Sequence, residues 1–279
     1  MRRATRLAHR GRAPQEVLPP VLADPVRFPY GPFKFKIQTV KRASYTILAS
    51  SDFAHWNPIA TEQAAADQQE YVDSDASKFS YRFYRVIAAG LPSATGLGFV
   101  SITLPPGFSL IANPFQRGNN VVADSFKGWK DGTTVNKFDT LLVRLTENAV
   151  KNGKWINANM QLFPGEGAIF FNPTDDYKTH SFVGEVREGS STVPIPSGFS
   201  LRSSLVPQAG NLLDDLKFPI SEGDVVHLFD RDRQKYMLHP FENGKWTAGA
   251  PVLSMGEAFW VAKAEPGNWS KSFSLGEAG

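Results

Sequence analysis

The stretch Pro106-Gly107-Phe108-Ser109-Leu110 returns as Ser197-Gly198-Phe199-Ser200-Leu201, 91 residues later. The same offset relates further matches that are spread over most of the second half of the chain. These are Phe138-Asp139 with Phe229-Asp230, Asn152-Gly153-Lys154-Trp155 with Asn243-Gly244-Lys245-Trp246, Gly165-Glu166 with Gly256-Glu257, and Ser181-Phe182 with Ser272-Phe273. Matches in one ungapped register indicate a duplicated structural unit.

Composition and patterning point to an all-β chain. With 279 residues the sequence has room for two or three domains. Its 21 Phe, 23 Gly and 20 Pro are typical of short aromatic strands separated by turns. Residues 33–37, 45–50 and 81–86 alternate apolar with polar side chains, which predicts strands with one solvated face. Asn-Gly before an aromatic run predicts hairpins at 152–153 and 243–244.

We therefore expect three consecutive small antiparallel β-sandwich or barrel modules behind an extended arm. The predicted boundaries are a basic Pro-rich arm at 1–27, a β-sandwich at 28–90, a linker at 91–97, and the two copies of the duplicated module at 98–188 and 189–279.

The first module resembles a known family. The residues are Tyr45-x-Ile47-x-Ala49-Ser50-Ser51-Asp52-Phe53-x-x-Trp56-x-Pro58, followed by Asp73 and by Arg82-Phe83-Tyr84-Arg85-Val86. This pattern resembles a β-sandwich module of large secreted proteins of environmental bacteria, which reads Y-x-I-E-A-S-T-D-L-x-x-W-x-P and then R-F-Y-R-V. The sequence departs from it at Leu48 and Phe53. The resemblance implies a cell-surface or extracellular location and a scaffold role.

The duplicated half resembles a tandem β-module of secreted and cell-surface bacterial proteins. The matching order is G-[FW]-[SN]-L, an aromatic-Asp strand end, a Trp, and P-G-[EQ]-G/A before aromatics. The positions are Gly107–Leu110, Phe138-Asp139, Trp155 and Pro164–Gly167, and in the second copy Gly198–Leu201, Phe229-Asp230, Trp246 and Gly256–Ala258. Met255 replaces the proline in the second copy. The resemblance implies an extracellular structural or adhesive role.

The arm carries five cations and no acid in its first twelve residues, namely Arg2, Arg3, Arg6, Arg10 and Arg12. It is either a solvated tail or an electrostatic strap onto an acidic partner, a neighbouring subunit or a phosphate backbone. The net charge of +3 is small, so nucleic acid is not the expected partner. Met1-Arg2-Arg3 resembles the start of an export signal, but no apolar core follows. No apolar run is long enough to cross a membrane.

No catalytic or metal-binding pattern emerges from the sequence. The absence of cysteine excludes disulfides, thiolate metal sites and cysteine nucleophiles. The five histidines show no zinc-binding spacing, so we expect neither a metal nor a cofactor. Glu166 and Glu257 recur at one place in both repeats. They are interpreted either as turn residues that bind backbone amides or as the acid and base of a hydrolase.

Three tryptophans are candidates for ligand contact. Trp129 and Trp269 have no counterpart in the other repeat, which favours a surface position over a core position, and Trp56 lies in a predicted turn. Trp155 and Trp246 are equivalent, which places them in the module core.

The leading functional hypothesis is a non-catalytic structural or adhesive subunit of a cell-surface or extracellular assembly. It would bind copies of itself or other protein subunits through strand edges, aromatic patches and the arm. The alternative is a carbohydrate-binding protein that stacks sugars on exposed tryptophan. A hydrolase and a phage or virion decoration protein are the remaining hypotheses.

Overall fold

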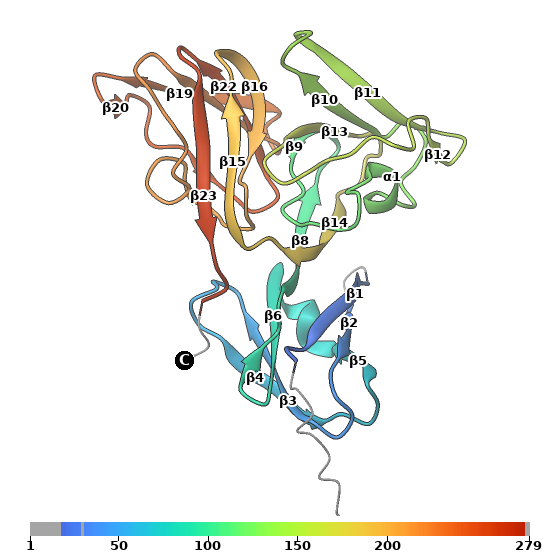
Figure 1. Cartoon of the computed structure of the whole chain (residues 1–279). Helices are drawn as coiled ribbons and strands as arrows, with labels where there is room; N and C mark the ends of the chain where they lie inside the picture. Colours follow the sequence, from blue (N-terminus) through green and yellow to red (C-terminus); the bar gives the residue numbers. More distant parts are fainter. Residues whose placement is uncertain (1–17, 29–30, 277–279) are drawn as a thin grey trace, which may run out of the picture.

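The computed structural model describes residues 18–28 and 31–276 (Figure 1). This part of the chain is nearly all β and forms several small antiparallel sheets, which confirms the predicted fold class. Its helical elements are the four-residue α1 (Val122–Ser125) and the 3-10 turn η1 (Ser74–Lys78). In Figure 1 the two repeats stand side by side above a sandwich made by the first part of the chain.

The first sandwich packs a three-stranded sheet against a larger one. The three-stranded sheet has the order β1 (Val21–Arg27), β2 (Phe33–Gln38), β5 (Gln68–Asp73). The facing sheet has the order β14 (Lys178–Val186), β8 (Gly96–Leu104), β6 (Tyr81–Ala88), β3 (Ser44–Ser50), β4 (Asn57–Gln63), and β7 (Leu91–Pro92) also pairs with β6. The alternation in β2 buries Phe33, Phe35 and Ile37 between the two sheets.

The arm and linker boundaries differ from the prediction. Residues 21–27, predicted as the end of the arm, form β1, which pairs along β2 and buries Leu22 in the sandwich core. A bulge between Ala23 and Val26 accommodates the proline at position 25, which has no N–H to donate. The predicted linker at 91–97 contains β7 and the start of β8. Because β8 pairs with β6 on one side and β14 on the other, it joins the first sandwich to the first repeat.

The two repeats form sheets with the same strand order. In the first repeat this is β12 (Lys154–Trp155), β11 (Arg144–Lys151), β10 (Thr134–Asp139), β13 (Ala168–Asn172), β9 (Gly107–Ile111). In the second it is β20 (Lys245–Trp246), β19 (Lys235–Glu242), β18 (Val225–Asp230), β22 (Ala258–Lys263), β16 (Gly198–Ser203). β15 (Gly189–Ile195) pairs with β23 (Gly267–Phe273) as β8 pairs with β14, and β17 (Gly210–Asn211) pairs with β21 (Val252–Leu253).

The repeat offset changes at the last strand. Ile102 pairs with His180, and its counterpart Val193 pairs with Trp269, so Trp269 takes the place of His180 at an offset of 89. The connection before β23 is two residues shorter than the connection before β14. The expected correspondence of 181–182 with 272–273 is therefore wrong.

The two Asn-Gly hairpins are equivalent in detail. Asn152 and Gly153 have φ of 51° and 71°, and the second pair has 54° and 73°. Both central residues of each turn thus adopt positive φ, as the sequence predicts. The carboxylate of Asp131 accepts both amides of the first turn at 2.7 Å, and Glu222, 91 residues later, accepts both amides of the second.

Candidate interaction surface

The two repeats meet across an approximate two-fold axis. Ala112 N donates to Gly256 O at 2.9 Å, and the equivalent Ser203 N donates to Gly165 O at 3.2 Å. Two isolated β-bridges at the same interface, Ile111 with Glu257 and Glu166 with Arg202, obey the same symmetry. An apolar cluster of Leu110, Ala112, Leu201 and Ala258 lies between the repeats, with Phe138, Ile169, Phe229 and Trp260 packed against it.

The recurring Gly-Glu pair is explained by this interface. Gly165 and Gly256 have φ of 91° and 78°, a region that favours glycine. A Cβ at Gly165 would lie 2.7 Å from Leu205 Cδ2 of the other repeat, and one at Gly256 would lie 2.8 Å from Ile102 Cγ2. Each repeat therefore needs a glycine at this position to let the other approach.

Glu166 and Glu257 are turn residues with cationic partners. Glu166 Oε2 accepts from Phe163 N and from Lys137 Nζ, both at 2.8 Å. Glu257 accepts from Ser254 N and from Arg231 Nη2, both at 3.0 Å. The interpretation of both carboxylates as ligands of backbone amides is confirmed. Each carboxylate is thus held by one cation and one main-chain amide.

Trp269 lies in the core of the second repeat, so the prediction of a surface position is wrong. The side chain is 1% exposed, packs edge-on against Phe218 with ring centroids 4.9 Å apart, and donates its Nε1–H to Leu216 O at 2.8 Å. Trp155 and Trp246 are half-buried and pack against the cores of the first and second repeats.

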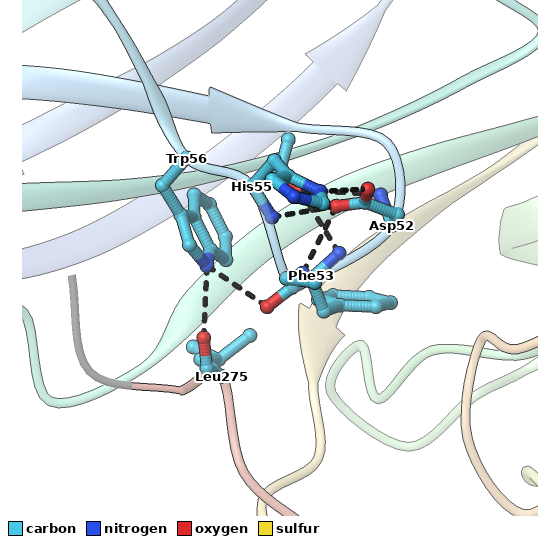
Figure 2. A network of polar contacts seen from close by, with 7 residues as sticks. Asp52, Phe53, His55, Trp56 and Leu275 are labelled. Atoms are coloured by element: carbon cyan, nitrogen blue, oxygen red, sulfur yellow. Dashed lines mark hydrogen bonds and ion pairs between the residues drawn. The ribbon is translucent and has the colours of Figure 1, made fainter. Parts of the chain in front are cut away.

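Trp56 is engaged by the C-terminal segment (Figure 2). Its Nε1–H is shared between Phe53 O at 3.1 Å and Leu275 O at 2.9 Å, and the Arg85 guanidinium lies 5.4 Å from the ring centroid. The preceding turn is held by Asp52, which accepts from the main chain and the ring of His55. The hydrogen bond from the His55 ring lowers the pKa of Asp52. Trp56 therefore joins two parts of the chain.

Trp129 is half-buried and lines a hollow of about 330 Å³. Trp155, Lys127 and Lys154 lie on the same hollow. The Trp129 ring is packed edge-on against Phe170, with centroids 4.8 Å apart. This hollow thus presents indole and ammonium groups together.

The five arginines predicted as a partner-binding strap, Arg2, Arg3, Arg6, Arg10 and Arg12, lie outside the described residues. In residues 18–28 and 31–276 no three His, Asp or Glu side chains are grouped so that they could hold a metal ion. Across the same ranges no helix has the length and apolar character needed to cross a membrane.

Exposed apolar side chains lie in the 140–143 turn of the first repeat and on the strands β16 and β19 of the second repeat, on both sides of one hollow. We call this set the apolar patch; it consists of Leu141, Leu142, Val143, Phe199, Tyr236 and Leu238, which are between 47% and 91% exposed. Val143, Phe199 and Tyr236 line one hollow, and Leu238 lies two residues along β19 from Tyr236, on the same face. Sequence reasoning missed this patch. Its signal is the contrast between Thr140-Leu141-Leu142-Val143 and the equivalent Arg231-Asp232-Arg233-Gln234.

The strand beside the patch has an unpaired edge. β19 pairs with β18 along its length, but with β20 only at Phe241 and Glu242. The outer edge of residues 235–238 is free of strand partners within the described part of the chain. A free edge with exposed apolar side chains can accept a further strand.

Comparison with known proteins finds no related sequence and a weak structural similarity. No family model matches the sequence, and no curated protein matches it. A crystal structure of the FN1–FN3 domains of chicken CNTN1 is similar over 91% of this chain and 99% of that chain, with 11% identity and a TM-score of 0.22. A similarity this low supports no statement about the function of this chain.

Proposed function

We propose that the chain is a non-catalytic structural or adhesive subunit of a cell-surface or extracellular assembly. It binds other protein subunits through the apolar patch, the free edge of β19 and the basic arm. The observation that carries this proposal is the apolar patch, because a cluster of exposed apolar side chains on a folded β-module is typical of a protein interaction site. Glu166 and Glu257 each bind a main-chain amide and a cation, which is the structural role that the sequence also allowed for them.

The proposal is tested in cells that produce the chain. After mild cross-linking and fractionation, immunoblotting should find the wild-type chain at the surface of intact cells in a species of high mass. The double variant Tyr236→Ser/Leu238→Ser should be released as single chains. The matched control is Val252→Ser, which removes a 61% exposed apolar side chain outside the patch and should stay in the assembly. Wild-type chains recovered as free single chains from the cell interior would overturn the proposal.

A second candidate function is carbohydrate binding at the hollow beside Trp129. The observation that favours it is the combination of two indole rings with Lys127 and Lys154. Sugars bind by stacking on aromatic faces while polar groups take their hydroxyls. On a glycan array, the full chain should bind defined oligosaccharides and Trp129→Ala should lose the signal. A wild-type chain that binds no glycan rules out this function.

A further inference from the structure

The approximate two-fold axis generates two related positions at the rim of the inter-repeat interface, and one of them is closed. There, Phe108 N donates to Gln234 Oε1 at 2.8 Å, and Gln234 Nε2 donates back to Phe108 O at 2.8 Å. The Gln234 side chain also covers Gly107, where a Cβ would lie 2.7 Å from Oε1. The turn between β18 and β19 of the second repeat thus seals the start of β9 in the first repeat.

The other position is open. Val143 stands where Gln234 stands, with φ of 50° against 53°, and Phe199 stands where Phe108 stands. Phe199 holds the same register on β22 that Phe108 holds on β13, so its amide and carbonyl also point away from the sheet. Valine cannot bond them, and within the described residues no side chain does. A hollow of about 410 Å³ remains in place of the seal.

The chemistry of this hollow selects an apolar occupant. It is lined by Phe138, Val143, Phe199, His227, Tyr236 and Trp260. The His227 imidazole, the Tyr236 hydroxyl and the Trp260 indole N–H supply its polar side-chain groups. Burial lowers the pKa of His227, which favours the neutral ring. A sugar or an ion would lose hydration here and find few partners. An apolar side chain would lose no hydrogen bonds to water here, and it would bury the aromatic surface of the hollow.

The turn beside the hollow carries such side chains outward. Leu141 is 91% exposed and Val143 is 73% exposed, although the equivalent turn of the second repeat is charged. A surface that bears an apolar projection next to an apolar hollow is complementary to itself. When two chains are related by a two-fold axis, the projection of each chain fills the hollow of the other. Both sites are then occupied, and the assembly ends at two chains.

The hollow also continues an interface that this module already uses. Phe138 and Trp260 belong to the apolar cluster between the repeats, with ring centroids 4.9 Å apart, and both reach the wall of the hollow. Within the chain, a turn from one repeat covers the Phe-Ser-Leu strand of the other. In the symmetry-related position, the Phe199-Ser200-Leu201 strand lacks such a cover among the described residues, and the 140–143 turn makes no such hydrogen bonds to it.

We infer that the partner at this position is a second copy of the chain, docked about a two-fold axis with its 140–143 turn in the hollow beside Phe199. This inference rests on the proposed function as an assembly subunit and names one of its partners. Leu141 and Leu142 of each chain enter the hollow of the other, and the apolar patch becomes buried in the dimer.

The test measures the mass of the purified full chain by sedimentation velocity at increasing concentration. Wild type should pass from one chain of 30.8 kDa to two. Leu141→Asp places a charge at the docked position and should weaken dimerisation at least tenfold. Val143→Gln should do the same by a different route, since it supplies in the open position the amide that Gln234 supplies in the closed one. The matched control Ile156→Asp, at an exposed site after β12, should dimerise like wild type. Far-ultraviolet circular dichroism establishes that each variant is folded.

The outcomes separate this inference from the proposed function. A wild-type chain that stays at 30.8 kDa at every concentration overturns the dimer, and the cell fractionation then decides the assembly role independently. If wild type and both turn variants dimerise equally, the chain self-associates through another surface, and the proposed docking site is wrong. Dimerisation lost in both turn variants and kept in the control supports the inference.

Discussion

At the scale of single residues, the space on the two-fold axis between the repeats holds one methyl group. Exact symmetry would place two there, one from each repeat. Gly167 and Ala258 are equivalent positions that face each other. A Cβ built on Gly167 would lie 2.7 Å from Ala258 Cβ and 2.8 Å from Leu201 Cγ. Gly167→Ala overpacks this site and should lower the free energy of unfolding by about 1–3 kcal/mol, as measured by urea denaturation.

The matched experiment moves the methyl group across the axis. Adding Ala258→Gly to Gly167→Ala removes the closer of the two clashes, so the double variant should recover part of the lost stability. The contact with Leu201 remains, which is why recovery is partial. A double variant that is less stable than Gly167→Ala alone would show that the two positions do not compete for one space.

His180 makes stability depend on pH. Its ring is buried, with its centroid 4.0 Å from that of Phe126, and burial lowers its pKa from 6.5 to about 3. The unfolded chain therefore binds a proton between these values while the folded chain does not, and stability falls as pH drops from about 6.5 toward 3. The contribution is up to about 1.4 kcal/mol per pH unit.

We predict that His180→Phe, which keeps an aromatic ring against Phe126, flattens this dependence. The free energy of unfolding is measured for both proteins at several values between pH 7 and pH 4. The unfolding free energy of the variant minus that of wild type should increase as pH falls. Taking this difference removes the contribution of all other titrating groups, which the two proteins share. A constant difference across the range contradicts the assignment.

At the scale of secondary structure elements, local patterns predicted what is local. The alternation at 33–37 identified β2, and Asn-Gly at 152–153 identified a hairpin, because both depend on neighbours in sequence. The role of β8 could not be predicted, since its partner β14 begins long after it ends. Trp269 was misplaced because a shortened connection moved it onto the core position of His180, which an ungapped register cannot show.

The error in the predicted boundary of the arm has a measurable consequence, because the arm was predicted to include β1. It pairs along β2 and buries Leu22, so it belongs to the first sandwich. A chain that starts at Leu18 should melt like the full chain, whereas one that starts at Phe28 should lose at least about 2 kcal/mol through the exposed core alone. Calorimetry of the three chains checks this. If the chains that start at Leu18 and at Phe28 have the same melting temperature, residues 21–27 do not stabilise the sandwich and belong to the arm.

At the scale of the whole molecule, the segment after β23 packs back on the first sandwich. β8 ties the first sandwich to the first repeat, and the segment after β23 ties the second repeat back to the sandwich. Leu275 packs in the same core cluster as Phe53 and Phe83, and a Cβ at Gly96 would lie 2.7 Å from its Cδ1. The first sandwich is therefore tied to both repeats of the same chain.

The Trp56 indole supplies one polar contact to this C-terminal segment. The Arg85 guanidinium also donates to Leu275 O and Gly276 O, and Glu188 accepts from Leu275 N, so removal of the indole should loosen the segment. Trp56→Phe keeps most of the ring but deletes the donor to Leu275 O, which should cost about 1 kcal/mol and speed hydrogen exchange at residues 274–276. Trp246→Phe is the matched control, because its buried Nε1–H has no hydrogen-bond partner. The control should leave exchange at 274–276 unchanged. If both variants exchange like wild type there, the indole donor does not hold the segment. The remaining contacts then hold it, namely the apolar packing of Leu275 and its hydrogen bonds with Arg85 and Glu188.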